Sequence, residues 1–342
     1  MVEISLPISK SIANRLLILK AIRGEDLSDF SVDSSTPDDV RLLHSILLQH
    51  PINGTIDTRN CGTAMRFLTA YFAQKEGVQI VLDGTERMRE RPIADLVTTL
   101  RELGADINYI NKEGVPPLLI KGKKLLPKQV EIINPLSTQF VSALLLIGVD
   151  VTSNSNSPYI EMTRKVISGL SSDYNYLDWS AAAFWYEYVA LNGGELLLKG
   201  LHKDGLQGDE QVAEIFEALG VKSKFTADGV IIYRPNELIY PTEFNVDFSM
   251  YPDLYPAVYI CCKELGIPMI FTGLDHLAFK ESNRLTAVSQ VDGNKAECKH
   301  SMADHRIAMA LVSAGYKVDD IQCISKSYPQ FIEQWQTVSP LS

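Results

Sequence analysis

Cationic side chains recur along the chain in short segments that also carry hydroxyl or amide groups. The first is residues 9–15, Ser-Lys-Ser-Ile-Ala-Asn-Arg, and an apolar run at residues 16–22 follows directly. This pattern predicts a helix whose first turn holds Lys10 and Arg15, beside backbone N–H groups and the positive end of the helix dipole. Such a turn suits a phosphate or carboxylate ligand, and a solvated helix start with ordinary surface cations is the alternative.

Two polar segments in the first half precede apolar helical runs. In residues 60–66, Asn-Cys-Gly-Thr-Ala-Met-Arg, Gly62 would let the backbone approach a ligand closely and Thr63 would cap the next helix. A plain glycine turn with a capped helix is the alternative. Residues 137–140, Ser-Thr-Gln-Phe, would present hydroxyl and amide groups to a phosphate, or would simply cap a helix.

The densest positive charge lies in residues 85–93, which hold three arginines in five residues. Pro92 suits helix position N1, so we expect Arg91 at a helix start. Arginine forks match the oxygen geometry of carboxylates and phosphates. The segment therefore indicates either an anion site or a solvated run of charge.

The second half contains four further polar segments, at residues 251–256, 280–284, 304–306 and 325–329. Asp253 stands between two prolines, where a turn residue is common. Lysine, glutamate and arginine at i, i+1 and i+4 of residues 280–284 are compatible with a solvated helix face. Taken one at a time, these segments leave the choice between site and surface open.

Composition restricts the class of protein. The chain has 342 residues, a net charge of −10 and 46% apolar residues, which predicts one large or two medium domains with a sizeable core. The net charge argues against nucleic acid or an anionic membrane as the main partner. Apolar runs are too short to span a bilayer, and the N-terminus has no signal-peptide pattern. Five cysteines without metal-type spacing fit a reducing compartment, and we expect a cytoplasmic protein.

The elements that position these segments repeat. Three amphipathic helical patterns end in Leu-Gly and lead into strand-like runs, at residues 104–110, 220–225 and 266–271. Glycine just past a helix supplies the left-handed residue that ends it, and the alternating run that follows predicts a half-buried strand. Recurrence in both halves indicates repeated α/β units. We place a break near residues 173–178, with a new helix from Ser180 and a cleft between the halves.

Taken in order, the segments resemble the enolpyruvyl transferase family, over nearly the whole chain. The match is to the family branch that uses shikimate-3-phosphate. The matching motifs are Ser-Lys-Ser-x-x-Asn-Arg at 9–15, Asn-x-Gly-Thr-Ala-Met-Arg at 60–66, Arg-Met-x-Glu-Arg-Pro-Ile at 87–93, Ser-Thr-Gln-Phe at 137–140, Pro-Asp at 252–253, Lys-Glu-Ser-x-Arg at 280–284, Asp-His-Arg at 304–306 and Lys-Ser-Tyr-Pro at 326–329. Each motif is weak alone, and the ordered set is specific.

The resemblance implies a two-domain inside-out α/β barrel built from repeated βαβαββ units, with the active site in the cleft between the domains. The first strand would cross back to the C-terminal domain. The implied domains are residues 9–177, and residues 1–8 together with 178–342. The implied reaction transfers the enolpyruvyl group of phosphoenolpyruvate to the 5-hydroxyl of shikimate-3-phosphate.

The resemblance also implies a role for each matched residue. Lys10 would contact both substrates and act in catalysis, while Asp253 and Glu281 would move protons. The residues expected around shikimate-3-phosphate are Lys10, Ser11, Arg15, Ser137, Thr138, Gln139, Asn156, Asp253, His276 and Lys280. Those expected around phosphoenolpyruvate are Lys10, Gly62, Arg91, Gln139, Arg284, Arg306 and Lys326. No metal or other cofactor is implied, because lysine and arginine would neutralise the phosphates.

The chain departs from the family pattern at three positions. Asn283 stands where aspartate is usual, and His276 stands where asparagine is expected. Asn156 replaces a serine, with Ser157 adjacent, so either residue could make the phosphate contact there.

Two other functions share parts of the pattern. The branch that uses UDP-N-acetylglucosamine has Lys-Asn where this chain has Lys10-Ser11. A catalytically dead binding homologue would not need Lys10, Asp253, Glu281 and Arg306 together. We therefore expect a monomeric enzyme with two small-molecule substrates as partners, and with neither nucleic acid nor membrane among them.

Overall fold

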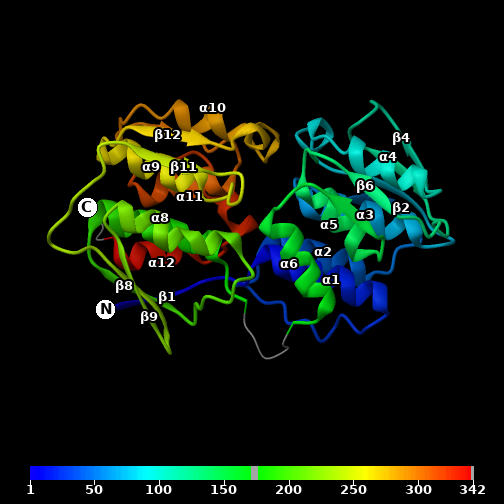
Figure 1. Ribbon diagram of the computed structural model, residues 1–342, viewed down its shortest axis with the longest axis horizontal. Helices are drawn as coiled ribbons and strands as arrows, with labels where there is room; N and C mark the ends of the chain where they lie inside the picture. Colours follow the sequence, from blue (N-terminus) through cyan, green and yellow to red (C-terminus); the bar gives the residue numbers. More distant parts are fainter. Residues whose placement is uncertain (171–175, 340–342) are drawn as a thin grey trace. The chain divides into compact units, whose positions relative to one another are not determined.

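The computed structural model describes residues 1–170 and 176–339, and the chain divides into two compact units (Figure 1). The N-terminal unit comprises Lys10–Val32 and Asp39–Ser172, and the C-terminal unit comprises Met1–Ser9, Asp33–Asp38 and Asp173–Ser342. Relative to the domains expected from the sequence, residues 33–38 belong with the C-terminal unit. Part of the expected break, residues 173–175, lies outside the described residues.

The N-terminal unit contains one complete βαβαββ repeat. Its four-stranded sheet has the order β2-β3-β5-β4, in which β2 and β3 are parallel and the other two pairings are antiparallel. A second sheet pairs β6 with β7 in parallel. The strands are β2 (Asn53–Asp57), β3 (Gln79–Asp83), β4 (Asp106–Tyr109), β5 (Leu118–Lys121), β6 (Val130–Ile132) and β7 (Val151–Ser153). The helices of this part of the chain are α1 (Lys10–Arg23), α2 (Asp38–Leu48), α3 (Gly62–Gln74), α4 (Ala94–Glu102), α5 (Thr138–Leu146) and α6 (Pro158–Ser168), with a 3₁₀ turn η1 (Met88–Glu90).

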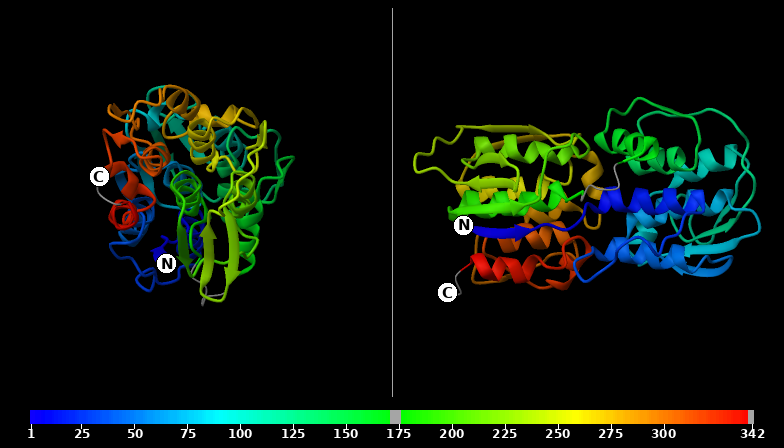
Figure 2. Two further views of the ribbon diagram at one scale, coloured as in Figure 1. Left: turned by 90° about the vertical axis from the view of Figure 1, so that its left-hand side faces the viewer. Right: turned by 90° about the horizontal axis from the view of Figure 1, so that it is seen from below.

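The C-terminal unit repeats this arrangement with a strand from the start of the chain. Its four-stranded sheet has the order β1-β8-β10-β9, and β1 runs parallel to β8. In Figure 2 the blue N-terminal strand lies beside the green strands of this unit. The strands are β1 (Val2–Ser5), β8 (Glu195–Lys199), β9 (Lys222–Thr226), β10 (Gly229–Tyr233), β11 (Phe244–Asp247), β12 (Met269–Thr272), β13 (Cys298–Lys299) and β14 (Lys317–Val318). The helices are α7 (Trp179–Asn192), α8 (Val212–Ala218), α9 (Tyr255–Leu265), α10 (Arg284–Ser289), α11 (His305–Ser313) and α12 (Phe331–Val338), with 3₁₀ turns η2 (Gly208–Gln211), η3 (Asp275–Phe279) and η4 (Gln322–Lys326).

The remaining repeats are shorter than the resemblance implied. Segments β6-α5-β7-α6, β11-α9-β12-α10 and β13-α11-β14-α12 keep the two parallel strands and two helices. Within the described residues their sheets are two-stranded, so the closing hairpin is absent from each. The chain thus has a two-unit α/β fold, and in the part of the chain that the structure describes one repeat per unit carries four strands.

Three glycines end helices as the sequence predicted. Gly104 follows α4 with φ of 92°, Gly220 follows α8 with φ of 87°, and Gly266 follows α9 with φ of 68°. The predicted strands β4, β9 and β12 come next. A residue with a Cβ rarely adopts these backbone angles. Glycine therefore allows the chain to turn sharply between the helix and the strand.

Helix α7 is the centre of the C-terminal unit. It begins close to the predicted Ser180, and Asp178 caps it by accepting a hydrogen bond from Ser180 N at 2.9 Å. Nearly every residue of α7 is buried, and it packs against α8, α9 and α11. A helix that is apolar on all sides must be covered on all sides. Its neighbours α9 and α11 are preceded by the segments that carry Asp253 and Asp304, so core packing fixes those segments.

Candidate active site

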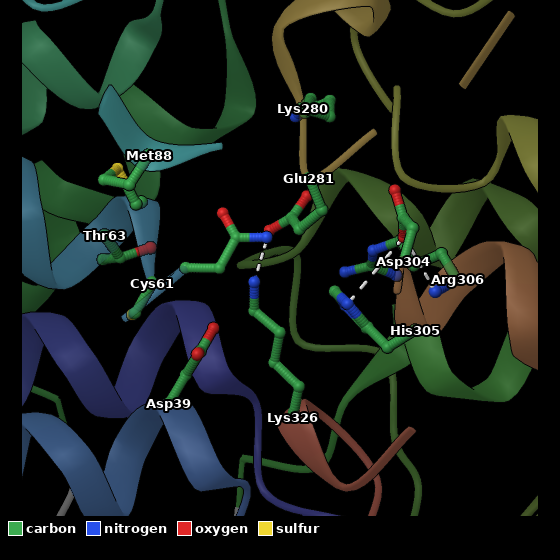
Figure 3. A network of polar contacts seen from close by, with 12 residues as sticks. Asp39, Cys61, Thr63, Met88, Lys280, Glu281, Asp304, His305, Arg306 and Lys326 are labelled. Carbon is green, nitrogen blue, oxygen red and sulfur yellow. Dashed lines mark hydrogen bonds and ion pairs between the residues drawn. The ribbon is translucent and has the colours of Figure 1, made fainter. Parts of the chain in front are cut away.

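The first turn of α1 holds a buried ion pair. Lys10 Nζ lies 2.9 Å from Asp39 Oδ2 at the start of α2, and both side chains are about nine-tenths buried (11% and 7% exposed). The helix begins where the sequence predicted, so Lys10 and Ser11 occupy its N-terminal turn. Asp39 was not predicted, because an aspartate near a helix start is a common capping residue and nothing in the sequence links it to Lys10. Figure 3 labels Asp39.

Arg15 lies one turn further along α1 and is buried among hydroxyl and carbonyl oxygens. Its Nε donates to Thr163 Oγ1 at 2.7 Å, and its Nη2 donates to Ser142 Oγ at 3.1 Å and to the Tyr159 carbonyl at 3.2 Å. Burial lowers the pKa of Arg15 to about 10, which leaves it charged at neutral pH. These bonds tie α1 to α5 and α6, so Arg15 holds three helices in register.

Gly62 is the first residue of α3, and two arginine side chains lie against it. A Cβ at position 62 would come within 2.6 Å of Arg91 Nη2 and 3.0 Å of Arg66 Nη1. Arg91 Nη1 donates to the Asn60 carbonyl at 3.4 Å, while Arg66 donates to the Gly62 and Pro92 carbonyls at 3.3 and 3.0 Å. Both guanidinium groups are buried. Glycine therefore leaves the two guanidinium groups room that a Cβ would partly occupy.

Two local expectations about these segments were wrong. The α3 cap is Cys61, whose Sγ accepts from Ala64 N, whereas Thr63 was expected to cap. Pro92 precedes α4 and does not occupy its N1 position, because α4 begins at Ala94 and Arg91 ends the turn η1. The cause is a 3₁₀ turn between strand and helix, for which the arginine-rich sequence gives no signal.

Ser137, Thr138 and Gln139 lie at the start of α5, as expected. Ser137 Oγ caps the helix by accepting from Gln139 N at 3.3 Å. Gln139 Nε2 donates to Thr63 Oγ1 at 3.2 Å, which joins this motif to the start of α3. Figure 3 shows Cys61 and Thr63 at that helix start. Two segments far apart in sequence therefore present their helix N-termini together.

The fifth polar position of the N-terminal unit lies before α6. Asn156 is exposed, whereas Ser157 is buried and caps α6 by accepting from Tyr159 N at 3.3 Å. The Ser157 hydroxyl is thus occupied by the helix, while the Asn156 amide faces solvent.

The C-terminal unit holds a dense network of cations and carboxylates. Asp253 lies 2.9 Å from Arg284 Nη1, 3.0 Å from Arg306 Nη2 and 3.4 Å from Lys280 Nζ. Glu281 lies 3.1 Å from Arg284 Nη2 and 3.0 Å from Lys326 Nζ. Lys280, Glu281, Arg306 and Lys326 are labelled in Figure 3. Four segments that are separate in sequence thus meet, and the structure overturns the solvated helix face considered for residues 280–284.

A third carboxylate, Asp304, also holds Arg284. The sequence motif at residues 304–306 contains Asp304, but no site role was predicted for it. Asp304 accepts from Arg284 Nε at 2.9 Å and from Ser282 Oγ at 3.1 Å, and it caps α11 by accepting from Arg306 N at 3.0 Å. It is fully buried. Asp304 therefore orients the Arg284 guanidinium and fixes the start of α11, the helix that carries Arg306. The capping pattern Asp-His-Arg before an apolar run was the available signal.

Electrostatics fix the charge states of the network. Burial by itself would raise the pKa of Asp253, but Arg306, Lys280 and Arg284 outweigh it and hold that pKa well below its usual range. Burial lowers the pKa of Lys280, and Asp253 partly restores it. Burial would also lower the pKa of Arg284, but Asp304, Asp253 and Glu281 raise it above its usual value. Asp253 is therefore an ionised base and Arg284 a permanent cation.

His276 lies in η3 beside the network. Burial, and then the charge of Lys280, lower the pKa of His276 to about 4, so its ring is neutral at neutral pH. Its Nε2 is buried and makes no hydrogen bond within the described residues. A neutral imidazole with a spare nitrogen can exchange a hydrogen bond with a substrate hydroxyl, as an asparagine amide could.

In residues 1–170 and 176–339, no group of three or more His, Cys, Asp or Glu side chains is arranged to hold a metal ion. None of the helices in those residues combines the length and apolar character that crossing a membrane requires.

Comparison with known proteins shows to which family the chain belongs. A sequence model of EPSP synthase (3-phosphoshikimate 1-carboxyvinyltransferase) matches residues 30–173 and 176–335. A 3-phosphoshikimate 1-carboxyvinyltransferase of Bacteroides fragilis is 34% identical over 389 residues, covering 96% of this chain and 93% of the relative. One of Photobacterium profundum is 27% identical over 419 residues, covering 98% and 96%.

A solved structure of an EPSP synthase from Acinetobacter baumannii has the same fold, with a TM-score of 0.66 at 18% identity over 97% of this chain and 94% of that one. The family model matches most of the chain, and the Bacteroides fragilis relative is more than 30% identical. Both findings agree with the motifs that lie at the helix N-termini and in the ion network. The chain belongs to the EPSP synthase (3-phosphoshikimate 1-carboxyvinyltransferase) family.

Proposed function

We propose that the protein transfers the enolpyruvyl group of phosphoenolpyruvate to the 5-hydroxyl of shikimate-3-phosphate, releasing phosphate. The observation that carries this proposal is the ionised state of the buried Asp253 carboxylate. Three cations contact it and keep it ionised in a buried setting, which is what a base that removes a hydroxyl proton requires. Lys280 and the neutral His276 lie beside it and would hold the neighbouring hydroxyl groups.

Glu281 has a second role in this reaction. Arg284 and Lys326 hold its carboxylate at 3.1 and 3.0 Å. A substrate carboxylate or phosphate that binds these cations would replace Glu281 as their counter-charge, and the released carboxylate would then take up a proton more readily. Glu281 would deliver that proton to C3 of phosphoenolpyruvate and remove one when phosphate leaves. Two carboxylates with different partners thus divide the acid and base tasks.

The N-terminal unit would bind the anionic groups. Lys10, Ser11 and the α5 start at Ser137, Thr138 and Gln139 would hold the shikimate phosphate, together with Asn156. Arg91 would hold phosphoenolpyruvate oxygens, with Gly62 leaving space. Arg15 would either contact the same phosphate directly or hold α1 in place. Its hydrogen bonds to Thr163 and Ser142 favour the second role. Lys10 and Gln139 would also contact phosphoenolpyruvate. In the C-terminal unit, its expected ligands are Arg284, Arg306 and Lys326.

A phosphate-release assay tests the proposal. Purified protein should release phosphate only when both shikimate-3-phosphate and phosphoenolpyruvate are present. Release with UDP-N-acetylglucosamine in place of shikimate-3-phosphate would assign the chain to the sister activity. Binding of shikimate-3-phosphate without any turnover would assign it to a dead homologue and overturn the proposal.

We also propose that the enzyme acts as a monomer in the cytoplasm. The five cysteines are all free thiols, which suits a reducing compartment. Size-exclusion chromatography with light scattering tests the monomer, and a stable dimer at micromolar concentration would contradict it.

A further inference from the structure

Two adjacent residues just before Asp304 adopt a backbone conformation that is costly for a residue with a Cβ. Met302 has φ of 54° and Ala303 has φ of 52°. Both values lie in the left-handed region, which residues other than glycine adopt rarely and usually singly. Among the described residues five non-glycine residues have a positive φ, and these two are the ones that follow one another. Such a turn persists only where its surroundings hold it.

Packing of the two side chains does not hold this turn. Met302 is 45% exposed, and Ala303 is exposed as well. Burial of apolar surface therefore offsets little of the unfavourable backbone conformation. A hydrogen bond from Asp304 N to the Ser301 carbonyl, at 3.0 Å, closes the turn. The same bond forms in right-handed turns, so it does not select the left-handed form.

A carboxylate from the neighbouring strand fixes the residue at which the turn begins. Asp319 Oδ1 accepts hydrogen bonds from the backbone N–H and the Oγ of Ser301, each at 2.8 Å. Asp319 Oδ2 lies 2.9 Å from His300 Nδ1. Strands β13 and β14 are parallel, so the residues that follow them meet at the same end of the pair, where Asp319 N donates to the Lys299 carbonyl at 3.1 Å. Asp319 thus anchors the turn to β14.

Asp319 is a charged acceptor. Burial by itself would raise the pKa of Asp319, but hydrogen bonds from Ser301 and His300 outweigh it and hold that pKa at about 2. Hydrogen bonds to an ionised acceptor are stronger than those between neutral groups. The anchor therefore keeps its strength throughout the neutral pH range.

The turn leads directly into the ion network. Asp304 accepts hydrogen bonds from Arg284 Nε at 2.9 Å and from Ser282 Oγ at 3.1 Å. The Arg284 guanidinium in turn lies 2.9 Å from Asp253 and 3.1 Å from Glu281. A shift of the turn would move the buried Asp304 carboxylate, and with it the arginine that contacts both proposed proton-transfer groups.

We propose that Asp319 is a positioning residue for the transfer reaction, which keeps the Met302–Ala303 turn in its left-handed form and thereby places Asp304 and Arg284. This rests on the proposed function and extends it to a carboxylate beyond the two proton-transfer groups. Without the anchor the turn relaxes toward the right-handed form that its residue types prefer. The loss then falls mainly on kcat, because Arg284 contacts the groups that move protons.

Steady-state kinetics of three variants test the anchor. Asp319→Ala should lower kcat by roughly tenfold, because the lost hydrogen bonds to a charged acceptor bias the turn by about that factor. The KM for shikimate-3-phosphate should change less than kcat. Asp319→Asn keeps an acceptor for both Ser301 donors and should retain most of kcat. The matched control is Asp26→Ala, because Asp26 also accepts from a serine N–H (Ser28, 2.8 Å) but lies beyond the C-terminal end of α1. Its kcat should equal that of wild type.

A glycine in the turn separates positioning from a general loss of stability. Ala303→Gly removes the steric cost of the left-handed form, so in the Asp319→Ala background it should restore kcat by roughly fivefold. In the wild-type background it should leave kcat unchanged, because the anchor already holds the turn. A merely structural role for Asp319 predicts a lower melting temperature, unchanged kcat where the variant is folded, and no rescue by glycine. That result would overturn the inference.

Hydrogen–deuterium exchange follows the turn without reference to activity. The amides of Asp304 and Arg306 donate to the Ser301 carbonyl and to Asp304 Oδ1. Their exchange should be faster in Asp319→Ala than in wild type, and slower again when Ala303→Gly is added. Equal exchange in wild type and Asp319→Ala would contradict the inference whether or not the protein turns over. Absence of phosphate release by the wild-type protein would overturn the proposed function instead, so the two failures are distinguishable.

Discussion

The two units use buried arginine in opposite ways. In the N-terminal unit Arg15 and Arg91 donate to hydroxyl and carbonyl oxygens, and within the described residues neither pairs with a carboxylate. In the C-terminal unit Arg284 contacts Asp253, Glu281 and Asp304, and Arg306 contacts Asp253. Both kinds of arginine are at least nine-tenths buried, so the contrast lies in the partners.

This difference separates two tasks. Neutral oxygen partners orient a guanidinium without cancelling its charge, which leaves positive potential for a dianionic phosphate. Carboxylate partners fix a guanidinium more tightly and, in return, the cations keep the carboxylates ionised. The first arrangement suits binding and the second suits proton transfer. We therefore expect anion affinity to depend most on the N-terminal unit and turnover to depend most on the C-terminal unit.

The largest expected effect is on turnover. Glu281→Gln keeps the shape of the side chain but cannot carry a proton between substrate atoms. General acid–base catalysis contributes on the order of 10²–10⁴-fold, so kcat should fall by about that factor while binding of shikimate-3-phosphate is retained. Steady-state kinetics and calorimetric titration measure the two quantities. A variant that keeps more than about a tenth of wild-type kcat would refute the role of Glu281.

The second effect is on stability and compares one arginine from each unit. Arg284→Met would leave three carboxylates without their shared cation, which should reduce the free energy of unfolding by about 3–5 kcal/mol. Arg91→Met removes bonds to neutral groups and should cost about 1–2 kcal/mol. Chemical denaturation of both variants measures the difference. Equal losses would remove the proposed distinction between the two units.

A third prediction concerns a carboxylate in the C-terminal unit that lacks such partners. Glu187 on α7 is fully buried, and neither of its oxygens makes a hydrogen bond within the described residues. Burial, and then the charge of Glu264, raise the pKa of Glu187 well above its usual value, while Lys295 partly offsets the rise. It should respond to pH in the opposite sense to Asp253.

The sign of the Glu187 effect follows from proton linkage. Between the unfolded pKa of about 4.3 and the raised folded pKa, the folded state binds more protons, so wild-type stability should fall as pH rises. Glu187→Gln removes this penalty and should be more stable than wild type by about 1–3 kcal/mol at neutral pH, with a smaller difference at pH 5. Denaturation at both pH values measures it. A gap that widens toward acid pH would show that Glu187 is stabilised in its charged form.

The smallest expected effect concerns Gly62. A Cβ there would meet the flexible end of Arg91 at 2.6 Å, so Gly62→Ala should displace the guanidinium slightly without unfolding α3. Loss of one charge-assisted hydrogen bond corresponds to roughly a tenfold increase in KM for phosphoenolpyruvate. The KM for shikimate-3-phosphate should change less. A larger change for shikimate-3-phosphate would place Gly62 beside the other substrate.

The sequence was sufficient for much of the local structure. Residues 9–15 and 137–140 predicted helix starts because hydroxyl and amide groups precede apolar runs, and α1 and α5 begin there. The three Leu-Gly patterns predicted helix ends and following strands for the same local reason. These features depend on residues a few positions apart, so their cause is visible in the chain itself. The family membership also followed from sequence, since the ordered motifs specify it together.

Tertiary structure decided which groups share a charge. Nothing local in the sequence connects Lys10 with Asp39, Arg284 with Asp304, or Arg306 with Asp253, because each pair comes from separate elements. Residues Met88–Glu90 likewise form a 3₁₀ turn, and α4 begins only at Ala94, although Pro92 suggested a helix start. Burial and the distance to a partner charge set a protonation state, and both depend on how α7, α9 and α11 pack. The sequence by itself therefore determined the repeats, the helix termini and the family, while packing determined which carboxylates carry a proton.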